Sequence, residues 1–389
     1  MIAPTQAAAL LAPAGEELLK RLHGETITPE RAMRLTDELR GRYPPELVAA
    51  ALTQQTLRVA AREKFSRADE MFFTRAGLEQ ASAEVVARHS ARRFSGMAAV
   101  ADLCCGIGGD LAALAQGADR VLAVDADVDT LRFARRNVVA GRAAVCFVCA
   151  DVQQVTPARR HGISGVFIDP ARRMPGRRLR AGDSRPPLDW CLGLASWVDA
   201  VGIKTAPGLP REAVPSGWEA EFVALGRGLK EALVWSPALA SARRRATVLP
   251  GGDTLVDDLG DPVPVAEPGR YLLDPNPAVT RAGLVQELAR AIAAWQIDPM
   301  IAFLSADSPV STPFARTLRV VDSLPWHEKQ VARKLRALGI GSADIRRRGL
   351  AGDVAQIHRR LALQGDRSAT IVLTRREGKP WSLICEPIG

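Results

Sequence analysis

The pattern of apolar and polar positions changes near residue 93. Before that point, apolar residues recur near the helical period, most clearly from Pro44 to Lys64 at Leu47, Leu52, Leu57 and Ala60. A further helix is predicted over Ala76–Arg92. We therefore expect residues 1–92 to form a helical N-terminal region.

After this point, short apolar runs alternate with helical patterns. Strands are predicted at Ala98–Leu103, Arg120–Val124, Ala144–Val148, Gly165–Ile168 and Val198–Ile203. Helices are predicted through Leu111 and Leu114 and over Val128–Val139. Because strands that alternate with helices pair in parallel, this order predicts an α/β fold with a doubly wound parallel sheet over residues 93–250.

Residues 251–315 are expected to connect this sheet to a last domain. The stretch Gly251–Gly269 is rich in Gly, Pro and Asp, and an amphipathic helix is predicted over Thr280–Trp295. Residues 316–389 match the pattern of a small α+β domain. Its predicted elements are Leu318–Val321, Pro325–Leu338, Ile345–Arg348, Asp353–Leu363, Thr370–Thr374 and Trp381–Cys385.

Composition narrows the class of protein. Of 389 residues, 47% are hydrophobic and 24% charged, which is typical of a globular chain and excludes disordered and collagen-like classes. No run of about 18 apolar residues exists, so no membrane span is predicted. The first residues lack the basic region of a signal peptide, so a cytoplasmic location is expected. Lys and Arg number 52 against 43 Asp and Glu, and this excess favours an anionic partner.

Cysteine and histidine usage argues against a metal enzyme. Six cysteines are too few for a disulfide scaffold, so we expect reduced, mostly buried thiols. Cys146 and Cys149 have CxxC spacing on a predicted strand, where positions three apart face opposite sides. With five histidines, no HExxH motif and no paired CxxC, the sequence predicts no metal site.

A glycine-rich phrase joins the first strand to the helix that follows: Asp102-Leu103-Cys104-Cys105-Gly106-Ile107-Gly108-Gly109-Asp110. Glycines there allow a tight turn and the close approach of a ligand to the backbone, although many such loops are plain turns. In a dinucleotide site, the helix N-terminus faces a pyrophosphate. The acids that flank this loop would repel a pyrophosphate and suit a cationic cofactor.

Four acids are predicted at the same edge of the sheet: Asp102, Asp125, Asp151 and Asp169. Asp125 ends the second strand, where a carboxylate can accept hydrogen bonds from both hydroxyls of a ribose. Each acid by itself is also a common turn residue at a strand end. Together, the four suit a ligand with an amino group, a ribose, an adenine and a sulfonium, and that ligand is S-adenosylmethionine.

In these phrases the sequence resembles a class I S-adenosylmethionine-dependent methyltransferase, which implies a Rossmann-like core. The phrases DLCCGIGGD, AVDAD, CAD and IDPARR occur in the family's order. The phrases KFSRADEMFFTRAGLEQAS, DIRRRGL and RLALQGDRSATIVLTRR resemble a bacterial group that carries a C-terminal THUMP-like domain. One departure is Cys104, which stands where the usual loop has glycine.

The resemblance implies which residues hold the cofactor. Four would line its methionine part: Asp102, Cys105, Gly106 and Gly108. Asp125 would hold the ribose, Asp151 would face the adenine amino group, and Val152 would lie against the adenine ring. The segment Phe72-Phe73-Thr74 resembles one that closes over the cofactor in cap-guanosine hypermethylases. For the two phenylalanines, plain core packing is the alternative.

The phrase Asp169-Pro170-Ala171-Arg172-Arg173 occupies the place of an element of amino-directed methyltransferases, in which Asp, Asn or Ser precedes two prolines and an aromatic residue. There the polar side chain and the proline carbonyl accept hydrogen bonds from the target amino group. The resemblance thus implies catalytic roles for Asp169 and Pro170. Ala171 departs from the element because it replaces the second proline. Arg172 and Arg173 would bind a substrate phosphate or merely solvate a loop.

Further candidates for substrate binding are basic. Lys204 follows the fifth predicted strand, and arginines are in excess from Arg159 to Arg185. The last domain holds the cluster Arg346, Arg347 and Arg348. The resemblance makes this domain THUMP-like, and THUMP domains are RNA-binding modules. Arginines at the ends of helices and strands suit phosphate contacts, and a solvated charged face is the alternative.

We therefore expect a cytoplasmic S-adenosylmethionine-dependent methyltransferase that modifies an exocyclic or ring nitrogen of structured RNA, either tRNA or rRNA. Two alternatives remain: a methyltransferase for a small molecule or protein, and an RNA-binding protein with a degenerate methyltransferase core. No membrane partner and no metal are expected, and the sequence does not predict the oligomeric state.

Overall fold

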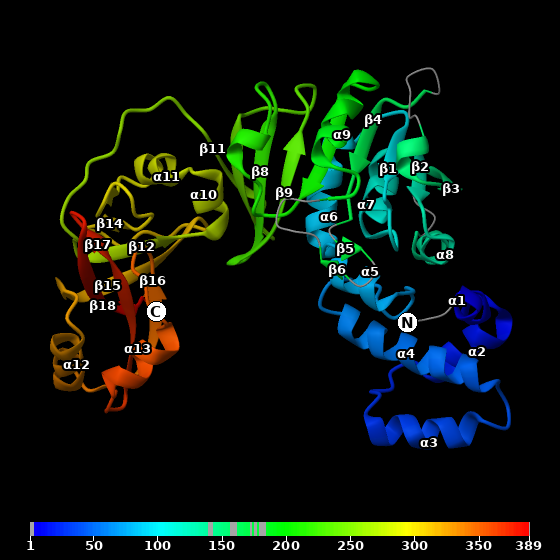
Figure 1. Cartoon of the computed structure of the whole chain (residues 1–389), viewed down its shortest axis with the longest axis horizontal. Coiled ribbons are helices and arrows are strands. Elements are labelled where there is room, and N and C mark those ends of the chain that lie inside the picture. The colour runs from blue at the N-terminus through cyan, green and yellow to red at the C-terminus, as the bar shows by residue number, and fades with distance from the viewer. Residues whose placement is uncertain are drawn as a thin grey trace. The chain divides into compact units, whose positions relative to one another are not determined.

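The computed structural model describes residues 4–138, 143–155, 162–171, 173–174, 177–178 and 184–388 (Figure 1). At residues 4–6, 173–174 and 177–178 it describes the backbone alone. The chain folds into two compact units. Unit 1 comprises Met1–Ala220 and Lys230–Ser241, and unit 2 comprises Glu221–Leu229 and Ala242–Gly389.

Unit 1 begins with helices, as the apolar pattern predicts. They are α1 (Pro4–Leu11), α2 (Pro13–Arg21), α3 (Pro29–Leu39), α4 (Pro45–Ala61), α5 (Arg75–Gln80) and α6 (Glu84–Ala91). Leucines of the first four helices form one core, in which Leu10, Leu18 and Leu39 are fully buried. Proline stands at or next to the first position of α2, α3 and α4, where its missing N–H costs no hydrogen bond.

The helix expected over Ala76–Arg92 is divided into α5 and α6. Lys64 Nζ donates to carbonyls at the C-terminus of α5, those of Leu78 at 2.7 Å and Ala81 at 2.9 Å. These bonds satisfy carbonyl groups that a continuing helix would otherwise pair. Ser82 Oγ then donates to the carboxylate of Glu231 at 2.5 Å. Tertiary hydrogen bonds therefore decide where the helix ends.

The strands of unit 1 lie in the order β9-β7-β4-β1-β2-β3. Their bounds are β1 (Val100–Leu103), β2 (Arg120–Asp125), β3 (Ala144–Cys149), β4 (Gly165–Ile168), β7 (Ala200–Thr205) and β9 (Gly228–Trp235). The first five are parallel, whereas β9 is antiparallel to β7. The predicted parallel sheet is thus confirmed, and β9 was not predicted.

Helices alternate with these strands: α7 (Gly109–Gly117), α8 (Val128–Asn137) and α9 (Leu188–Gly193). Shorter elements of unit 1 are η1 (Arg92–Phe94), η2 (Val152–Gln154), η4 (Leu194–Ser196), η5 (Arg211–Ala213), β5 (Arg173–Met174) and β6 (Arg177–Arg178). β1 is buried along its whole length, as expected for a central parallel strand. β3 lies at the sheet edge, and its Cys146 and Cys149 are exposed, contrary to the expectation of mostly buried thiols.

Unit 2 holds two groups of strands. β8 (Glu219–Leu225, in this unit from Glu221), β10 (Arg244–Leu249) and β11 (Asp253–Val256) lie in the order β11-β10-β8. A second sheet has the order β13-β14-β12-β15-β18-β17-β16. Its strands are β12 (Tyr271–Pro275), β13 (Trp295–Gln296), β14 (Leu304–Ala306), β15 (Ala315–Pro325), β16 (Ile340–Arg347), β17 (Arg367–Arg376) and β18 (Lys379–Pro387).

The stretch expected to be a connector supplies strands to this second sheet. β12 pairs with β15 in antiparallel register, Leu272 opposite Leu318. The helix expected over Thr280–Trp295 is instead α10 (Pro277–Ala282) and α11 (Val285–Ala291). Gly283 separates them at φ 69°, a left-handed torsion that ends a helix and that glycine adopts without strain.

The tail of unit 2 forms the small α+β fold predicted for it. α12 (Glu328–Ala337) and α13 (Val354–Leu361) contact each other and β16. Their apolar faces enclose a core with β17 and β18 that includes Val331, Leu335, Leu361, Ile371 and Ile384. Among the residues that the structure describes, no helix is both long and apolar enough to cross a membrane.

Candidate active site

The glycine-rich phrase forms the loop between β1 and α7. Its backbone takes left-handed torsions at Cys104, Gly106 and Gly108, with φ of 62°, 55° and 87°. Cys104, which replaces the family's glycine, thus keeps a torsion that glycine adopts more readily. A side chain at Gly106 would meet no atom within 4 Å, so the loop backbone is open to a ligand there.

A cavity of about 220 Å³ lies beside this loop. Seven of the predicted site residues are among those that line it: Thr74, Asp102, Cys105, Gly106, Asp125, Asp169 and Pro170. The lining also includes Asp110, which the sequence indicated only as an acid flanking the loop. Four carboxylates from three strand ends and one helix start therefore face one cavity.

Two of these carboxylates have buried oxygens without a partner. Asp102 Oδ2 and Asp110 Oδ1 make no hydrogen bond within the described part of the chain. Asp102 is 1% exposed, and its burial raises the pKa of its carboxyl well above the usual range. The nearby carboxylates of Asp110 and Asp169 raise this pKa further. A cationic ligand group would relieve both the burial and the repulsion.

Lys204 is the buried counter-ion of this cluster. Its Nζ lies 2.7 Å from Asp169 Oδ2 and 2.9 Å from Asp110 Oδ2, and 2% of its side chain is exposed. Burial lowers the pKa of Lys204, but the carboxylates of Asp110, Asp169 and Glu231 together outweigh burial and raise this pKa well above the ordinary value. The sequence indicated a substrate contact; in the structure Lys204 orients two carboxylates and has almost no exposed surface.

Glu231 on β9 is a further buried acid near Lys204. Ser82 Oγ and Ser90 Oγ donate to its carboxylate at 2.5 Å and 3.4 Å. Burial raises the pKa of Glu231 to about 7, against the opposing field of Lys204. The sequence gave no signal for Glu231, because its position depends on β9 lying next to β7.

Asp125 connects the loop to the end of β2. Its Oδ2 accepts the N–H of Gly106 at 2.9 Å, and its Oδ1 accepts the N–H of Asp127 at 3.0 Å. Burial raises the pKa of Asp125, while these N–H groups partly offset that effect. Burial and nearby carboxylates also raise the pKa of the Cys104 thiol, so it stays protonated and is not a thiolate nucleophile.

Five predicted cofactor residues are not among those that line the cavity: Phe72, Phe73, Gly108, Asp151 and Val152. Asp151 accepts the N–H of Gln153 at 3.0 Å and lies 3.9 Å from Arg185 Nη2. Val152 is 4% exposed and belongs to the core of the sheet. Gly108 faces α8, where a Cβ would lie 3.3 Å from Ala134 Cα, so it serves the close approach of loop and helix.

The rings of Phe72 and Phe73 pack in the core, which was the alternative to a cofactor contact. The Phe72 ring stacks on Phe133 at 5.7 Å, and the Phe73 ring lies 5.8 Å from Phe65. Thr74, the next residue, lines the cavity and caps α5 by accepting the N–H of Gly77 at 2.9 Å.

Asn137 at the end of α8 fixes this segment to the glycine loop. Its Oδ1 accepts the N–H of Phe72 at 2.7 Å, and its Nδ2 donates to the carbonyls of Phe72 and Ile107, both at 2.8 Å. Asn137 was not among the residues predicted for the site. Its role depends on the packing of α8 against the glycine loop and Phe72, which buries the amide and which the sequence does not show.

A larger cavity of about 630 Å³ shares Gly109 with the first. Its lining includes the cations Arg67, Arg88 and Arg92 and the single acid Glu84. This charge does not suit a cationic cofactor, whereas the four acids of the smaller cavity do. Among the described residues, no group of three or more Cys, His, Asp or Glu could hold a metal ion.

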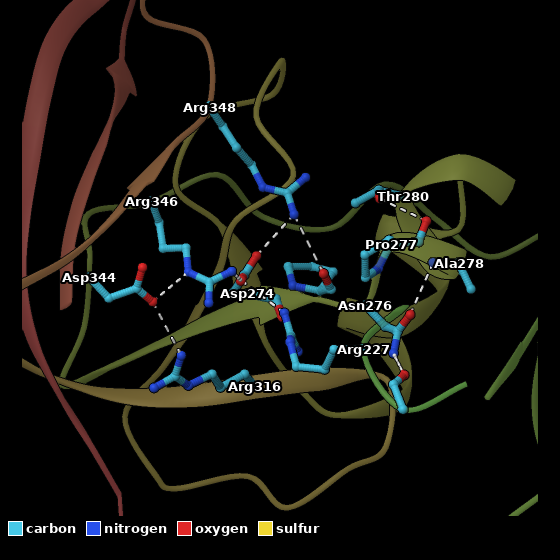
Figure 2. Close-up of polar contacts among 12 residues, drawn as sticks. Arg227, Asp274, Asn276, Pro277, Ala278, Thr280, Arg316, Asp344, Arg346 and Arg348 are labelled. Atoms are coloured by element: carbon cyan, nitrogen blue, oxygen red, sulfur yellow. Dashed lines mark hydrogen bonds and ion pairs between the residues drawn. The ribbon is translucent and has the colours of Figure 1, made fainter. Parts of the chain in front are cut away.

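The predicted arginines have different surroundings. Arg172 lies outside the described residues, as do Arg159, Arg160 and Arg180, and Arg173 is described by its backbone alone. In unit 2, Arg346 and Arg348 reach the carboxylate of Asp274 (Figure 2). Arg347 is exposed, and the alternation of a strand turns it to the opposite face.

Known proteins are similar to this chain in sequence and in fold. Residues 315–387 match the family model described as THUMP domain-like, and residues 4–61 match a domain of unknown function, DUF8688. The chain is 39% identical over 312 residues to the S-adenosylmethionine-dependent methyltransferases MT3122 and Rv3037c of two Mycobacterium tuberculosis strains, across 79% of this chain and 85% of each relative.

A crystal structure from Porphyromonas gingivalis W83, described as a methyltransferase, has the same fold. It matches with a TM-score of 0.74 at 19% identity, over 94% of this chain and 100% of that chain. The core of unit 1 therefore has the class I methyltransferase fold. With the identity to the mycobacterial relatives, the chain belongs to the S-adenosylmethionine-dependent methyltransferases, and its cofactor is S-adenosyl-L-methionine.

Proposed function

We propose that this enzyme methylates a base nitrogen of structured RNA, either tRNA or rRNA, in the cytoplasm. The observation that carries the proposal is the cavity in which Asp169 and Pro170 lie beside two buried carboxylate oxygens without partners. That arrangement supports an acceptor-binding role for Asp169 and Pro170 beside a site that suits a cationic cofactor.

The residues of the cavity fit the cofactor. Asp102 and Asp110 would hold its amino group, since each has a buried oxygen that lacks a hydrogen-bond donor. Asp125 would hold the ribose hydroxyls. The open backbone at Gly106 would leave room for the part of the cofactor that joins its amino group to its ribose. When bound, S-adenosylmethionine supplies an activated methyl group on a sulfonium.

Asp169 and Pro170 would act on the acceptor. The Asp169 carboxylate would accept a hydrogen bond from the target N–H and stabilise the positive charge that develops on that nitrogen. The Pro170 carbonyl would accept a second N–H and so fix the direction of the lone pair. Lys204 holds Asp169 Oδ2 at 2.7 Å and thereby limits the rotation of this carboxylate. Alignment and charge stabilisation are the contributions expected for a direct displacement.

Two observations support RNA as the substrate. Residues 315–387 match a THUMP domain-like family, and THUMP domains are RNA-binding modules. The chain also carries a net charge of +9, and four arginines of unit 2 lie around the carboxylates of Asp274 and Asp344. Within this proposal, residues 93–250 are the methyltransferase domain and residues 316–389 the THUMP-like domain.

The test is methyl transfer from labelled S-adenosylmethionine to total RNA and, separately, to protein extract, both from a strain that lacks the gene. We expect label in the RNA fraction with the wild-type enzyme and transfer slowed by about 10²-fold or more with Asp169→Ala. Mass spectrometry of nucleosides from purified tRNA and rRNA then identifies the methylated base. Label in protein alone would contradict the proposal.

A further inference from the structure

Three arginines of unit 2 converge on the buried carboxylate of Asp274 (Figure 2). Asp274 has a side chain that is 6% exposed. Its Oδ2 accepts from Arg227 Nη2 at 2.9 Å, and its Oδ1 accepts from Arg348 Nη2 at 2.9 Å. Arg346 Nη1 lies 3.9 Å from Asp274 Oδ2. One buried acid thus gathers three guanidinium groups.

A second acid adds a fourth guanidinium to this group. Asp344 Oδ2 accepts from Arg346 Nε at 2.9 Å and lies 3.7 Å from Arg316 Nη1. Strand pairing brings Arg316 here, because it stands opposite Asp274 in the register of β15 and β12. The four arginines come from distant parts of the sequence: Arg227 after β8, Arg316 on β15, and Arg346 and Arg348 at the end of β16.

The charges of this group do not balance. Four guanidiniums are arranged around two carboxylates, which leaves two positive charges in excess. Burial lowers the pKa of Arg227, and the guanidiniums of Arg346, Arg316 and Arg348 lower it further, against the attraction of Asp274. The arginines therefore repel one another, and an anion among them would relieve the repulsion.

The group also has hydrogen-bond donors to spare. A guanidinium carries five N–H donors, and the contacts described for Arg227 and for Arg348 use one nitrogen each. Arg348 lies over the Phe303 ring at 5.2 Å, which fixes the plane of its guanidinium. Between 30% and 40% of each arginine side chain is exposed, so the donors are fixed in place yet reachable.

We propose that this group is a binding site for the phosphodiester backbone of the RNA substrate, formed by Arg227, Arg316, Arg346 and Arg348 and organised by Asp274. Planar forks of donors held at fixed positions suit the oxygens of phosphate groups. The proposal rests on RNA being the substrate. The shared chemistry is a phosphate group, which a free phosphate ion also presents.

The experiment measures binding of fluorescently labelled bulk tRNA to the full-length protein by anisotropy, over a series of salt concentrations. The double variant Arg346→Gln/Arg348→Gln should weaken binding by about 10- to 100-fold at low salt. The slope of log K against log salt should fall by about 1 to 2, because each lost phosphate contact contributes about 0.7 to 0.9.

Arg347→Gln is the matched control. It removes the same charge from the same strand, but from an exposed side chain outside the group that Arg227, Arg316, Arg346 and Arg348 form around Asp274 and Asp344. We expect a change in affinity of less than about twofold and an unchanged salt slope. Arg346→Lys/Arg348→Lys keeps the charge without the fork and should recover part of the affinity but not all of it.

The outcomes separate this site from the proposed function. Wild-type protein that neither binds nor methylates tRNA or rRNA overturns both. If the double variant binds tRNA as tightly as the wild type, the arginine site alone is overturned. The same holds if Arg347→Gln weakens tRNA binding as much as the double variant does.

Two further measurements distinguish a loss of RNA contacts from unfolding and from the binding of a free anion. If the double variant unfolds more easily than the wild type, the single variant Arg227→Gln replaces it, because Arg227 lies on a turn. Arg227→Gln should also weaken tRNA binding, by a smaller factor. An unchanged affinity of Arg227→Gln for tRNA would contradict the site. Inorganic phosphate at matched ionic strength is the second probe, and arginine-dependent binding of phosphate without any effect on tRNA would also overturn the proposal.

Discussion

The acidic cavity of unit 1 and the arginine cluster of unit 2 share one arrangement of charge: a single buried ion lies among a larger number of oppositely charged side chains. The signs of the charges are reversed between the two sites. In the cavity, one buried cation, Lys204, holds carboxylates that outnumber it. In the cluster, one buried anion, Asp274, holds guanidiniums that outnumber it. In each site, the central ion orients the side chains around it. The charge of those side chains that the central ion does not neutralise suits a ligand of the opposite sign. We propose a cationic cofactor for the first site and an RNA backbone for the second.

The two sites differ in burial, so removing the central charge should be costlier in the cavity. Lys204→Met removes the buried cation that pairs with Asp110 and Asp169, and we expect the free energy of unfolding to fall by about 3–5 kcal/mol. Chemical denaturation measures this. Lys230→Met, at an exposed position on β9, is the control and should change stability by less than about 0.5 kcal/mol. Equal effects of the two variants would refute the role of Lys204.

The chemistry of the cavity is tested at Asp169. Asp169→Ala should lower the single-turnover rate of methyl transfer by about 10²-fold or more, since it removes a group that stabilises developing charge. Cofactor affinity by calorimetry should change little. Asp169→Asn should be milder if hydrogen-bond acceptance is its whole role, because an amide oxygen still accepts. If the alanine variant transfers methyl at the wild-type rate, Asp169 has no catalytic role and is only a turn residue at the end of its strand.

The corresponding change in unit 2 is Asp274→Asn. The amide keeps the shape and one acceptor but removes the charge that pairs with Arg227 and Arg348. We expect a loss of about 1.5–3 kcal/mol in the free energy of unfolding, less than for Lys204→Met because the arginines are partly hydrated. A loss larger than that of Lys204→Met would contradict the comparison.

The buried acids of unit 1 also predict a pH dependence. Burial raises the folded-state pKa of Glu231 to about 7, whereas the unfolded value is near 4.5. Between these values the folded state binds more protons than the unfolded state, so stability falls as pH rises. Glu231→Gln should reduce this slope by up to about 1.4 kcal/mol per pH unit, measured by denaturation from pH 5 to 8. An unchanged slope would show that Glu231 is ionised throughout.

The sequence predicted the acidic cavity better than the arginine cluster, for a physical reason. Asp125 and Asp169 follow apolar strands directly, and parallel strands bring their carboxyl ends to one edge. Lys204 also follows such a strand, but its pairing with Asp110 depends on where a helix begins across the sheet. The surroundings of Asp274 depend on the register of strands far apart in sequence, which local periodicity does not contain.

The same dependence on pairing between distant strands explains why residues 251–315 were expected to form a connector and not part of a sheet. β12 is short, and its apolar residues have no periodic pattern long enough to distinguish a strand from a loop. Its pairing with β15 means that a protein cut before Leu318 would lose the sheet around Asp274. Point variants of the arginines therefore test RNA binding more cleanly than truncation does.

The smallest predicted effect concerns two adjacent cysteines of the glycine loop. Cys104 has φ 62°, a torsion that costs most residues roughly 1–2 kcal/mol, whereas Cys105 is not among the residues with positive φ. Cys104→Gly should relieve this strain and raise the free energy of unfolding slightly, by less than about 1 kcal/mol, because glycine also gains entropy in the unfolded chain.

Cys105→Gly makes the same chemical change at the next residue and should have the opposite sign. Cys105 is 7% exposed, so glycine there loses buried side-chain contacts and about 0.5–1 kcal/mol of backbone entropy without relieving any strain. Thermal and chemical denaturation of the two variants side by side give the comparison. If Cys104→Gly is as destabilising as Cys105→Gly, the left-handed torsion at Cys104 is not a source of strain, and its side-chain packing outweighs the backbone preference.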